Sequence, residues 1–187
     1  MKNFASWLLG VFGWRAITPP DNPPKSIICV APHTSNWDFI LGKLYYSAIG
    51  RHAGFLMKKD WFFFPLGGIL KSMGGIPVDR SRRGSMVEQL AERINESPKL
   101  SIAITPEGTR SATERWKTGF YRIAYAANIP IQLAVIDYKK RELGILETFY
   151  PTGDEEADIR YIRSRYHSEQ ARYPKKFIEQ QPSSFTF

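Results

Sequence analysis

Short apolar runs alternate with helical patterns along most of the chain. The runs cover residues 27–31, 54–57, 76–78, 100–104 and 131–136. Apolar positions recur at helical spacing between several of these runs, most clearly over residues 85–95 and 120–127,. A further strand over residues 143–149 and a broken helix over residues 158–177 follow them. Strands interleaved with helices predict an α/β fold, a single domain with a largely parallel or mixed sheet flanked by helices.

The N-terminal segment has a different pattern. Its apolar side chains recur at helical spacing and are Phe4, Trp7, Leu8, Val11 and Phe12,. We therefore predict an N-terminal amphipathic helix over residues 1–17, a Pro-rich linker over residues 18–24 and the main domain over residues 25–187. The apolar stretch is far shorter than the roughly 20 residues that span a bilayer, and it lacks a small-residue cleavage site. Packing on the domain and docking in a lipid interface both fit it, and its tryptophans favour docking.

Composition and charge narrow the class of protein. A chain of 187 residues with 43% hydrophobic content forms one sizeable core,. Residues 1–136 carry 17 basic and 9 acidic groups, whereas residues 137–187 carry 9 of each, so the whole excess of +8 lies in the first part. That excess favours an anionic partner: nucleic acid, a phosphorylated metabolite or a membrane surface. The only cysteine, Cys29, lies in an apolar run, which fits a core role and a reducing, cytoplasmic setting,.

Two candidate catalytic residues follow the first apolar run. His33 directly follows the apolar run, and Asp38 comes five residues later. In an unbroken helix the two side chains would point roughly 140° apart. If a helix starts after His33 with Ser35 as N-cap, Asp38 turns back toward the entering chain and a His33–Asp38 hydrogen bond becomes feasible. A plain capping box of Ser35 and Asp38 is the alternative.

Polar sequences follow two further apolar runs. Arg80 comes after residues 76–78, and the segment Glu107-Gly108-Thr109-Arg110 comes after residues 100–104. Ligands of open α/β sheets bind at the carboxyl ends of the strands. We therefore expect these loops to converge with the His33 loop at one edge of the sheet.

At these positions the chain resembles a known family. His33 to Asp38 reads H-T-S-N-W-D, which resembles the H-x-x-x-x-D motif of the glycerolipid acyltransferases, the lysophosphatidic acid acyltransferase family. Residues 107–111 read E-G-T-R-S and match a second motif of that family. Residues 75–80 and 129–131 resemble its other two blocks, so the resemblance covers about residues 25–137. Thr105 replaces a usual phenylalanine, and Leu133-Ala134 replaces a usual proline.

The resemblance implies direct acyl transfer from acyl-CoA or acyl-carrier protein to a lipid hydroxyl, without a metal or any cofactor other than the donor. It implies His33 as general base and Asp38 as the group that orients its ring, help typically worth about 10² to 10⁴ in rate. Arg80 and Arg110 are the expected ligands of an acceptor phosphate, because guanidinium groups match phosphate geometry. The other expected substrate-binding residues are Glu107, Gly108, Thr109, Lys58 and Lys117. For Glu107 the family implies a role in orienting Arg110 or the acceptor.

Three other interpretations compete with this one. A nucleic-acid-binding module would also be basic and aromatic, but zinc-site spacings and RNA-recognition signatures are missing, so we expect no nucleic-acid partner. A metal hydrolase would use His33, Asp38 and Glu107. A catalytically silent lipid-binding protein would share every feature. We expect the protein at the cytoplasmic face of an anionic membrane, as a peripheral or monotopic protein, with a phosphate-bearing lipid as acceptor; glycerol 3-phosphate or another lipid is the alternative acceptor.

Overall fold

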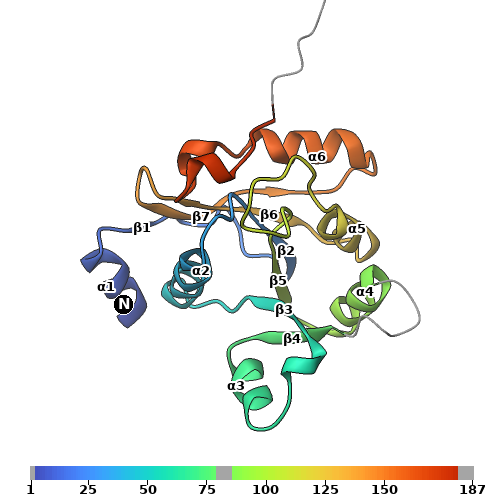
Figure 1. Cartoon of the computed structure of the whole chain (residues 1–187). Helices are drawn as coiled ribbons and strands as arrows, with labels where there is room; N and C mark the ends of the chain where they lie inside the picture. Colours follow the sequence, from blue (N-terminus) through green and yellow to red (C-terminus); the bar gives the residue numbers. More distant parts are fainter. Residues whose placement is uncertain (1–2, 79–85, 181–187) are drawn as a thin grey trace, which may run out of the picture.

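The chain forms one mixed β-sheet flanked by helices in the computed structural model, which describes residues 3–78 and 86–180 (Figure 1). Within these residues the sheet has seven strands in the order β1-β7-β6-β2-β5-β3-β4. The strands are β1 (Arg15–Ala16), β2 (Lys25–Val30), β3 (Gly54–Lys58), β4 (Gly75–Val78), β5 (Leu100–Ile104), β6 (Ile131–Asp137) and β7 (Glu142–Phe149). All neighbouring pairs are parallel except β6 and β7. The predicted α/β class and mixed sheet are confirmed.

Helices cover both faces of this sheet. The described α-helices are α1 (Phe4–Val11), α2 (Trp37–Ala48), α3 (Leu66–Ser72), α4 (Met86–Glu96), α5 (Gly119–Ala126) and α6 (Glu155–Ser164). Single turns of 3₁₀-helix add η1 (Lys59–Trp61), η2 (Ser168–Gln170) and η3 (Pro174–Lys176). α1 and α2 lie on one face, α4, α5 and α6 lie on the other, and α3 lies beyond β4 (Figure 1). None of the helices in residues 3–78 and 86–180 has the length and apolarity needed to cross a bilayer.

The central strand β2 shows why this sequence folds as a sheet buried on both sides. Ile27 and Cys29 pack into the core shared with α4, α5 and α6, whereas Ile28 packs into the core shared with α1 and α2. All three side chains are fully buried. Alternation between two apolar cores requires a continuous apolar run, which is the pattern that residues 27–31 carry,.

The N-terminal helix is shorter than the predicted residues 1–17. α1 ends at Val11, and Gly13 follows with a φ of 71°, a conformation that glycine adopts readily and that stops helices,. The chain then forms β1, whose Arg15 N–H donates to Arg141 O at 2.8 Å at the edge of β7. The last residues assigned to the helix therefore belong to the sheet.

The Pro-rich linker is fixed to the domain through Asp21. Its carboxylate accepts hydrogen bonds from Thr148 Oγ1 at 2.6 Å and from Gln132 Nε2 at 3.3 Å. Arg51 donates to the Asp21 carbonyl at 2.8 Å. These bonds hold the linker in a fixed position on the domain.

The parallel strands determine where chemistry can gather. β2, β5, β3, β4 and β6 run in one direction, so their carboxyl ends share one edge of the sheet. The loops after β2 and β5 carry His33 and Glu107 to this edge, and the residue after β6 is Tyr138.

Candidate active site

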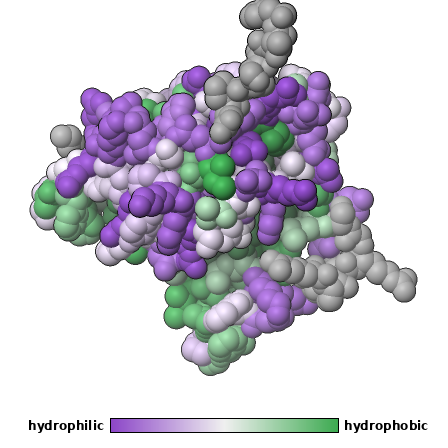
Figure 2. Space-filling model, turned by 45° about the horizontal axis from the view of Figure 1, so that its top comes forward, coloured by the Kyte–Doolittle hydropathy of each residue, from purple (hydrophilic) through white to green (hydrophobic). Residues whose placement is uncertain are grey.

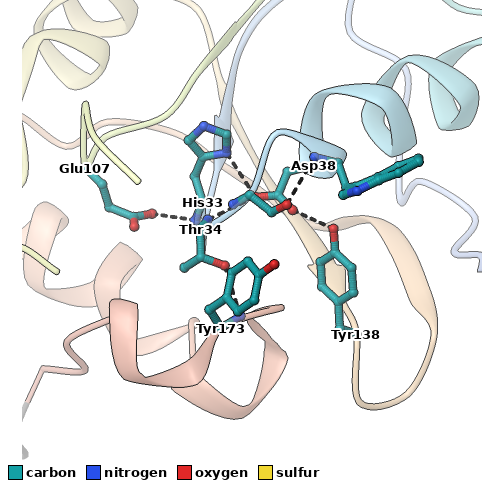
Figure 3. Close-up of polar contacts among 8 residues, drawn as sticks. His33, Thr34, Asp38, Glu107, Tyr138 and Tyr173 are labelled. Atoms are coloured by element: carbon teal, nitrogen blue, oxygen red, sulfur yellow. Dashed lines mark hydrogen bonds and ion pairs between the residues drawn. The ribbon is translucent and has the colours of Figure 1, made fainter. Parts of the chain in front are cut away.

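His33 and Asp38 meet in the turn between β2 and α2 (Figure 3). The His33 ring nitrogen Nδ1 lies 3.0 Å from Asp38 Oδ2. The helix begins at Trp37 with Asn36 as its N-cap, not at the position that a Ser35 N-cap would give. Ser35 Oγ nevertheless accepts the Trp37 N–H at 3.2 Å, as an N-cap side chain does,. The late start still directs Asp38 back toward His33.

The Asp38 carboxylate holds this turn together. Its Oδ2 atom accepts the backbone N–H groups of Thr34 and Ser35, each at 2.9 Å, in addition to the His33 ring. Capping and pairing with His33 are therefore both present, not alternatives. The side chain is only 3% exposed. Burial acts to raise the pKa of Asp38, but the hydrogen bonds from His33, Tyr138 and Ser35 outweigh it and hold the pKa below its ordinary value,.

The ionised carboxylate fixes the state of the imidazole. Because Asp38 accepts and cannot donate, the ring donates from Nδ1, and Nε2 keeps the lone pair that can take a proton,. The His33 ring retains some solvent exposure, whereas Asp38 behind it is buried. An imidazole with a free Nε2 and a buried carboxylate at Nδ1 has the geometry that general-base catalysis requires,.

Tyr138 is a member of the site that the sequence did not reveal. Its hydroxyl donates to Asp38 Oδ1 at 2.6 Å, from the residue that follows β6 (Figure 3). Burial and the neighbouring Asp38 carboxylate raise its pKa, so the phenol stays protonated and acts as a donor,. The Arg172 guanidinium packs over the rings of Tyr138 and Trp37, at 5.9 and 5.5 Å from their centres. The carboxyl-end rule applied to residues 131–136 was the only signal that pointed to this position.

Glu107 binds the His33 loop. Its Oε1 atom accepts the backbone N–H of His33 at 2.8 Å, and the side chain is 4% exposed. Burial raises the pKa of Glu107 to about 7, the His33 N–H opposes this rise, and the nearby Asp38 carboxylate adds to it,. The partner of Glu107 is thus the backbone amide of His33, whereas the family resemblance implied Arg110 or the acceptor.

The rest of the E-G-T-R-S segment faces solvent. Gly108 has a φ of 65°, and a side chain there would come within 2.8 Å of Lys117 Nζ, so a glycine lets the lysine cross this turn,. Thr109 Oγ1 accepts the Ser111 N–H at 3.2 Å. Arg110 is exposed, and no carboxylate of the described residues lies within ion-pair distance of its guanidinium. Residues 108–110 therefore form an exposed turn beside Glu107, and the Lys117 side chain lies against Gly108.

The other two cations predicted to bind the acceptor phosphate are Lys58 and Arg80. Lys58 ends β3 at the carboxyl edge, but its ammonium forms an ion pair with Asp60, so the cation is already neutralised by its own chain. Arg80 lies outside the described residues. Of the other predicted phosphate ligands, Lys117 lies against Gly108, and Arg110 follows two residues after Gly108.

The remaining side chains bear on two other kinds of chemistry, a cysteine nucleophile and a metal site. The Cys29 thiol is fully buried, and burial raises its pKa, so this side chain cannot serve as a thiolate nucleophile,. Across residues 3–78 and 86–180, no three His, Cys, Asp or Glu side chains are grouped so that they could hold a metal ion.

Comparisons with known proteins agree with the motifs. A family model described as acyltransferase matches residues 16–137. The 1-acyl-sn-glycerol-3-phosphate acyltransferase of Limnanthes alba is 29% identical over 133 residues, which are 67% of this chain and 45% of that protein. The enzyme of the same name from Cocos nucifera is 37% identical over 82 residues, 41% of this chain and 27% of that protein. The chain thus spans about half the length, or less, of these curated relatives.

A solved structure supports the same fold. The crystal structure of the 1-acyl-sn-glycerophosphate (LPA) acyltransferase of Thermotoga maritima is similar over 85% of this chain and 72% of that one, with a TM-score of 0.57. Sequence identity is 19%, so this likeness concerns the fold alone. The family match covers the β2–α2 turn, the Glu107 segment and the strands that hold them. This chain belongs to the acyltransferase family.

Proposed function

We propose that the protein transfers an acyl chain from acyl-CoA or acyl-carrier protein to a hydroxyl of a lysophospholipid such as 1-acylglycerol 3-phosphate. The observation that carries the proposal is the His33–Asp38 pair at 3.0 Å, with Asp38 also bound by Tyr138. The names of the relatives from Limnanthes alba and Cocos nucifera support this choice of acceptor.

The proposed reaction needs one base and no covalent enzyme intermediate. His33 Nε2 removes the proton of the acceptor hydroxyl as the oxygen attacks the thioester carbonyl. A C–O bond forms, the C–S bond breaks, and the imidazolium returns the proton to the departing thiolate. Asp38 stabilises the imidazolium during this step, as a buried, ionised carboxylate at Nδ1 can,.

The acceptor phosphate is proposed to bind at the exposed turn beside Glu107. Arg110 offers a guanidinium without a carboxylate partner in the described part of the chain, and Lys117 lies against Gly108 in the same turn. Arg80, which follows β4 in the sequence, is proposed as the second phosphate ligand. Glu107 is proposed to fix the position of the turn relative to His33.

We further propose that α1 docks the enzyme on the cytoplasmic face of an anionic membrane. Leu9 is 2% exposed and packs on the domain, whereas Phe4 is 74% exposed on the outer side of the helix with Trp7, Val11 and Phe12. The helix is thus held by one side and presents an apolar stripe on the other, as interfacial helices do. A single buried cysteine fits the reducing side of the membrane,.

A substrate panel tests the proposal. The purified protein is incubated with acyl-CoA or acyl-carrier protein and with lysophosphatidic acid, other lysophospholipids or glycerol 3-phosphate, and products are identified by mass spectrometry. We expect transfer to lysophosphatidic acid and loss of at least about 100-fold of the rate in His33→Ala. Transfer to glycerol 3-phosphate alone would show that the proposed acceptor is wrong. Binding without transfer to any acceptor would show that the protein binds lipid and is not an acyltransferase.

A further inference from the structure

The connection between β3 and β4 forms a lobe, residues 59–74, that consists of η1, a short loop and α3. Its exposed apolar side chains are Trp61, Phe63, Phe64, Ile69 and Met73. Phe64 is 96% exposed, which leaves a whole phenyl ring in water. Figure 2 shows this lobe as an apolar prominence at the bottom of the molecule, apart from the apolar surface over α1 at the left.

The outward direction of these rings is built into the backbone of the lobe. Gly67 packs so closely on Phe62 that an added side-chain carbon would lie 2.7 Å from its carbonyl oxygen. The Phe62 ring meets Gly75 from the inner side, at 3.2 Å from the position of such a carbon. Phe62 therefore packs inward while Phe63 and Phe64 are exposed. The Lys43 ammonium donates to Met73 O at 2.6 Å and ties the lobe to α2.

Apolar exposure of this kind is concentrated in one part of the described chain. Twelve of the nineteen large apolar side chains exposed among the described residues lie within residues 4–73, on α1, the start of α2 and the lobe. Of the seven outside this range, four are tyrosines, whose hydroxyls remain compatible with water,. Large exposed apolar patches of a soluble chain mark interaction sites.

Charge identifies what the lobe contacts. Residues 1–78 carry eight basic and three acidic side chains. Lys59 and Lys71 are exposed on the lobe, whereas Lys58 next to it is paired with Asp60. Aromatic rings flanked by lysines match the acyl and headgroup layers of an anionic bilayer. The lobe also begins at the carboxyl end of β3, on the same edge of the sheet as His33 and Glu107. Contact through the lobe therefore brings the active edge to the lipid surface.

We infer that the η1–α3 lobe is a second, independent lipid-insertion element, which places Phe63 and Phe64 among the acyl chains of an anionic membrane. The inference rests on the proposed function only in taking the acceptor to be a membrane lipid. A second copy of this chain is the competing occupant of the lobe, and the test below separates it from lipid.

A single-site fluorescent label tests the inference. Cys29 is fully buried, so Phe64→Cys introduces one accessible thiol for an environment-sensitive fluorophore. The control is Tyr150→Cys, at an exposed position after β7 and away from the lobe. We expect a blue shift with phosphatidylcholine–phosphatidylglycerol vesicles, and quenching by acyl-chain spin labels, for the label at position 64 only. A label that stays in water while the protein sediments with vesicles would overturn the inference.

A second measurement uses chains without labels. Phe63→Ser combined with Phe64→Ser should lower the vesicle partition coefficient by at least about tenfold, while turnover of a short-chain, dispersed acceptor is retained. A blue shift without vesicles that grows with protein concentration, together with a dimer in analytical ultracentrifugation, would assign the lobe to self-association instead. Vesicle binding needs no catalysis, so absence of acyl transfer with a normal shift would refute the proposed function and leave this inference intact.

Discussion

The hydroxyl of Tyr138 donates to Asp38 Oδ1 at 2.6 Å although the two residues are 100 positions apart in the chain. Asp38 lies at the start of α2, and Tyr138 follows β6. The bond therefore joins the start of α2 to the end of β6 at the carboxyl edge of the sheet. It leaves Asp38 with a donor on each oxygen, since Oδ2 receives the His33 ring and two backbone amides.

Replacing Tyr138 by phenylalanine removes this bond while keeping the ring. A hydrogen bond to a charged acceptor is worth about 1.5–3 kcal/mol, so we expect kcat/KM to fall about 10-fold or more. Because the bond favours the ionised carboxylate, its loss raises the pKa of Asp38 and moves the acid limb of the pH–rate profile to higher pH,. Tyr150→Phe, at an exposed tyrosine, is the control. An unchanged acid limb in Tyr138→Phe would contradict a positioning role.

Asp38→Asn keeps the size of the side chain but removes its charge. We expect kcat to fall by about 10² to 10⁴, because an amide no longer fixes the Nδ1–H tautomer or stabilises the imidazolium. The lowered pKa of Asp38 means that the native carboxylate contributes stability above its unfolded pKa and loses it as pH falls,. The melting temperatures of variant and wild type should therefore differ at pH 7 and converge in acid. Activity within tenfold of wild type would sink the assignment.

Glu107 should make stability depend on pH in the opposite direction. Its pKa is raised from 4.5 to about 7, so the folded state holds a proton that the unfolded state has released. Stability then falls as pH rises from about 4.5 to about 7 and stays low above it,. Glu107→Gln removes this titration and keeps an acceptor for the His33 N–H. We compare the free energies of unfolding of Glu107→Gln and wild type in denaturant titrations. The variant's value minus the wild-type value should be about 3 kcal/mol larger at pH 8 than at pH 4. Glu114→Gln, at an exposed position nearby, is the control.

Arg110→Ala should affect the acceptor selectively. The loss of charge-assisted hydrogen bonds to a phosphate predicts a decrease of about 10- to 150-fold in kcat/KM for a phosphate-bearing acceptor. The melting temperature should not change, because Arg110 is exposed and forms no ion pair with the described residues. Arg110→Lys should recover only part of the loss, since an ammonium lacks the bidentate fork. The same result is expected for Arg80→Ala, and Arg115→Ala, also exposed, is the control. Equal defects toward donor and acceptor would argue against phosphate binding.

The two sides of α1 should respond differently to substitution. Phe4→Ser combined with Trp7→Ser changes only exposed side chains, so we expect weaker co-sedimentation with anionic vesicles and an unchanged melting temperature,. Leu9→Ala changes a buried side chain and should destabilise the fold by about 2–5 kcal/mol,. Unaltered sedimentation of the first variant would mean that α1 serves the domain alone.

The sequence predicted those features that depend on local pattern. Residues 100–104 form the predicted strand with the same bounds, because Ile102 packs into one core and Ala103 lies against the other, as in a strand inside a sheet,. His33 and Asp38 meet as their five-residue spacing allows once the helix starts late. The strand β1 was hidden because it is only two residues long and directly follows the helical pattern of residues 4–12.

Features that depend on partners distant in the chain could not be predicted from the sequence. Tyr138 joins the site through a bond that spans 100 residues, and an isolated tyrosine after a strand carries no motif. Lys58 had the right position for a phosphate ligand, but the next turn of chain supplies Asp60 as its partner. Glu107 was assigned from its motif, whereas its contact with the His33 amide depends on the pairing of β2 with β5.

The two-residue strand β1 has a consequence for any shortened form of this chain. Its pairing with β7 covers the first part of the outer hydrogen-bonding edge of β7, through Arg15 N–H to Arg141 O and Ile17 N–H to Leu143 O, both at 2.8 Å. Removal of residues 1–17 would open that edge, and an unpaired strand edge invites other chains to add to it. A truncated protein would thus tend to polymerise along β7, and its sedimentation would report aggregation as well as lipid binding. Point substitutions on the outer side of α1 avoid this confusion because the edge stays closed.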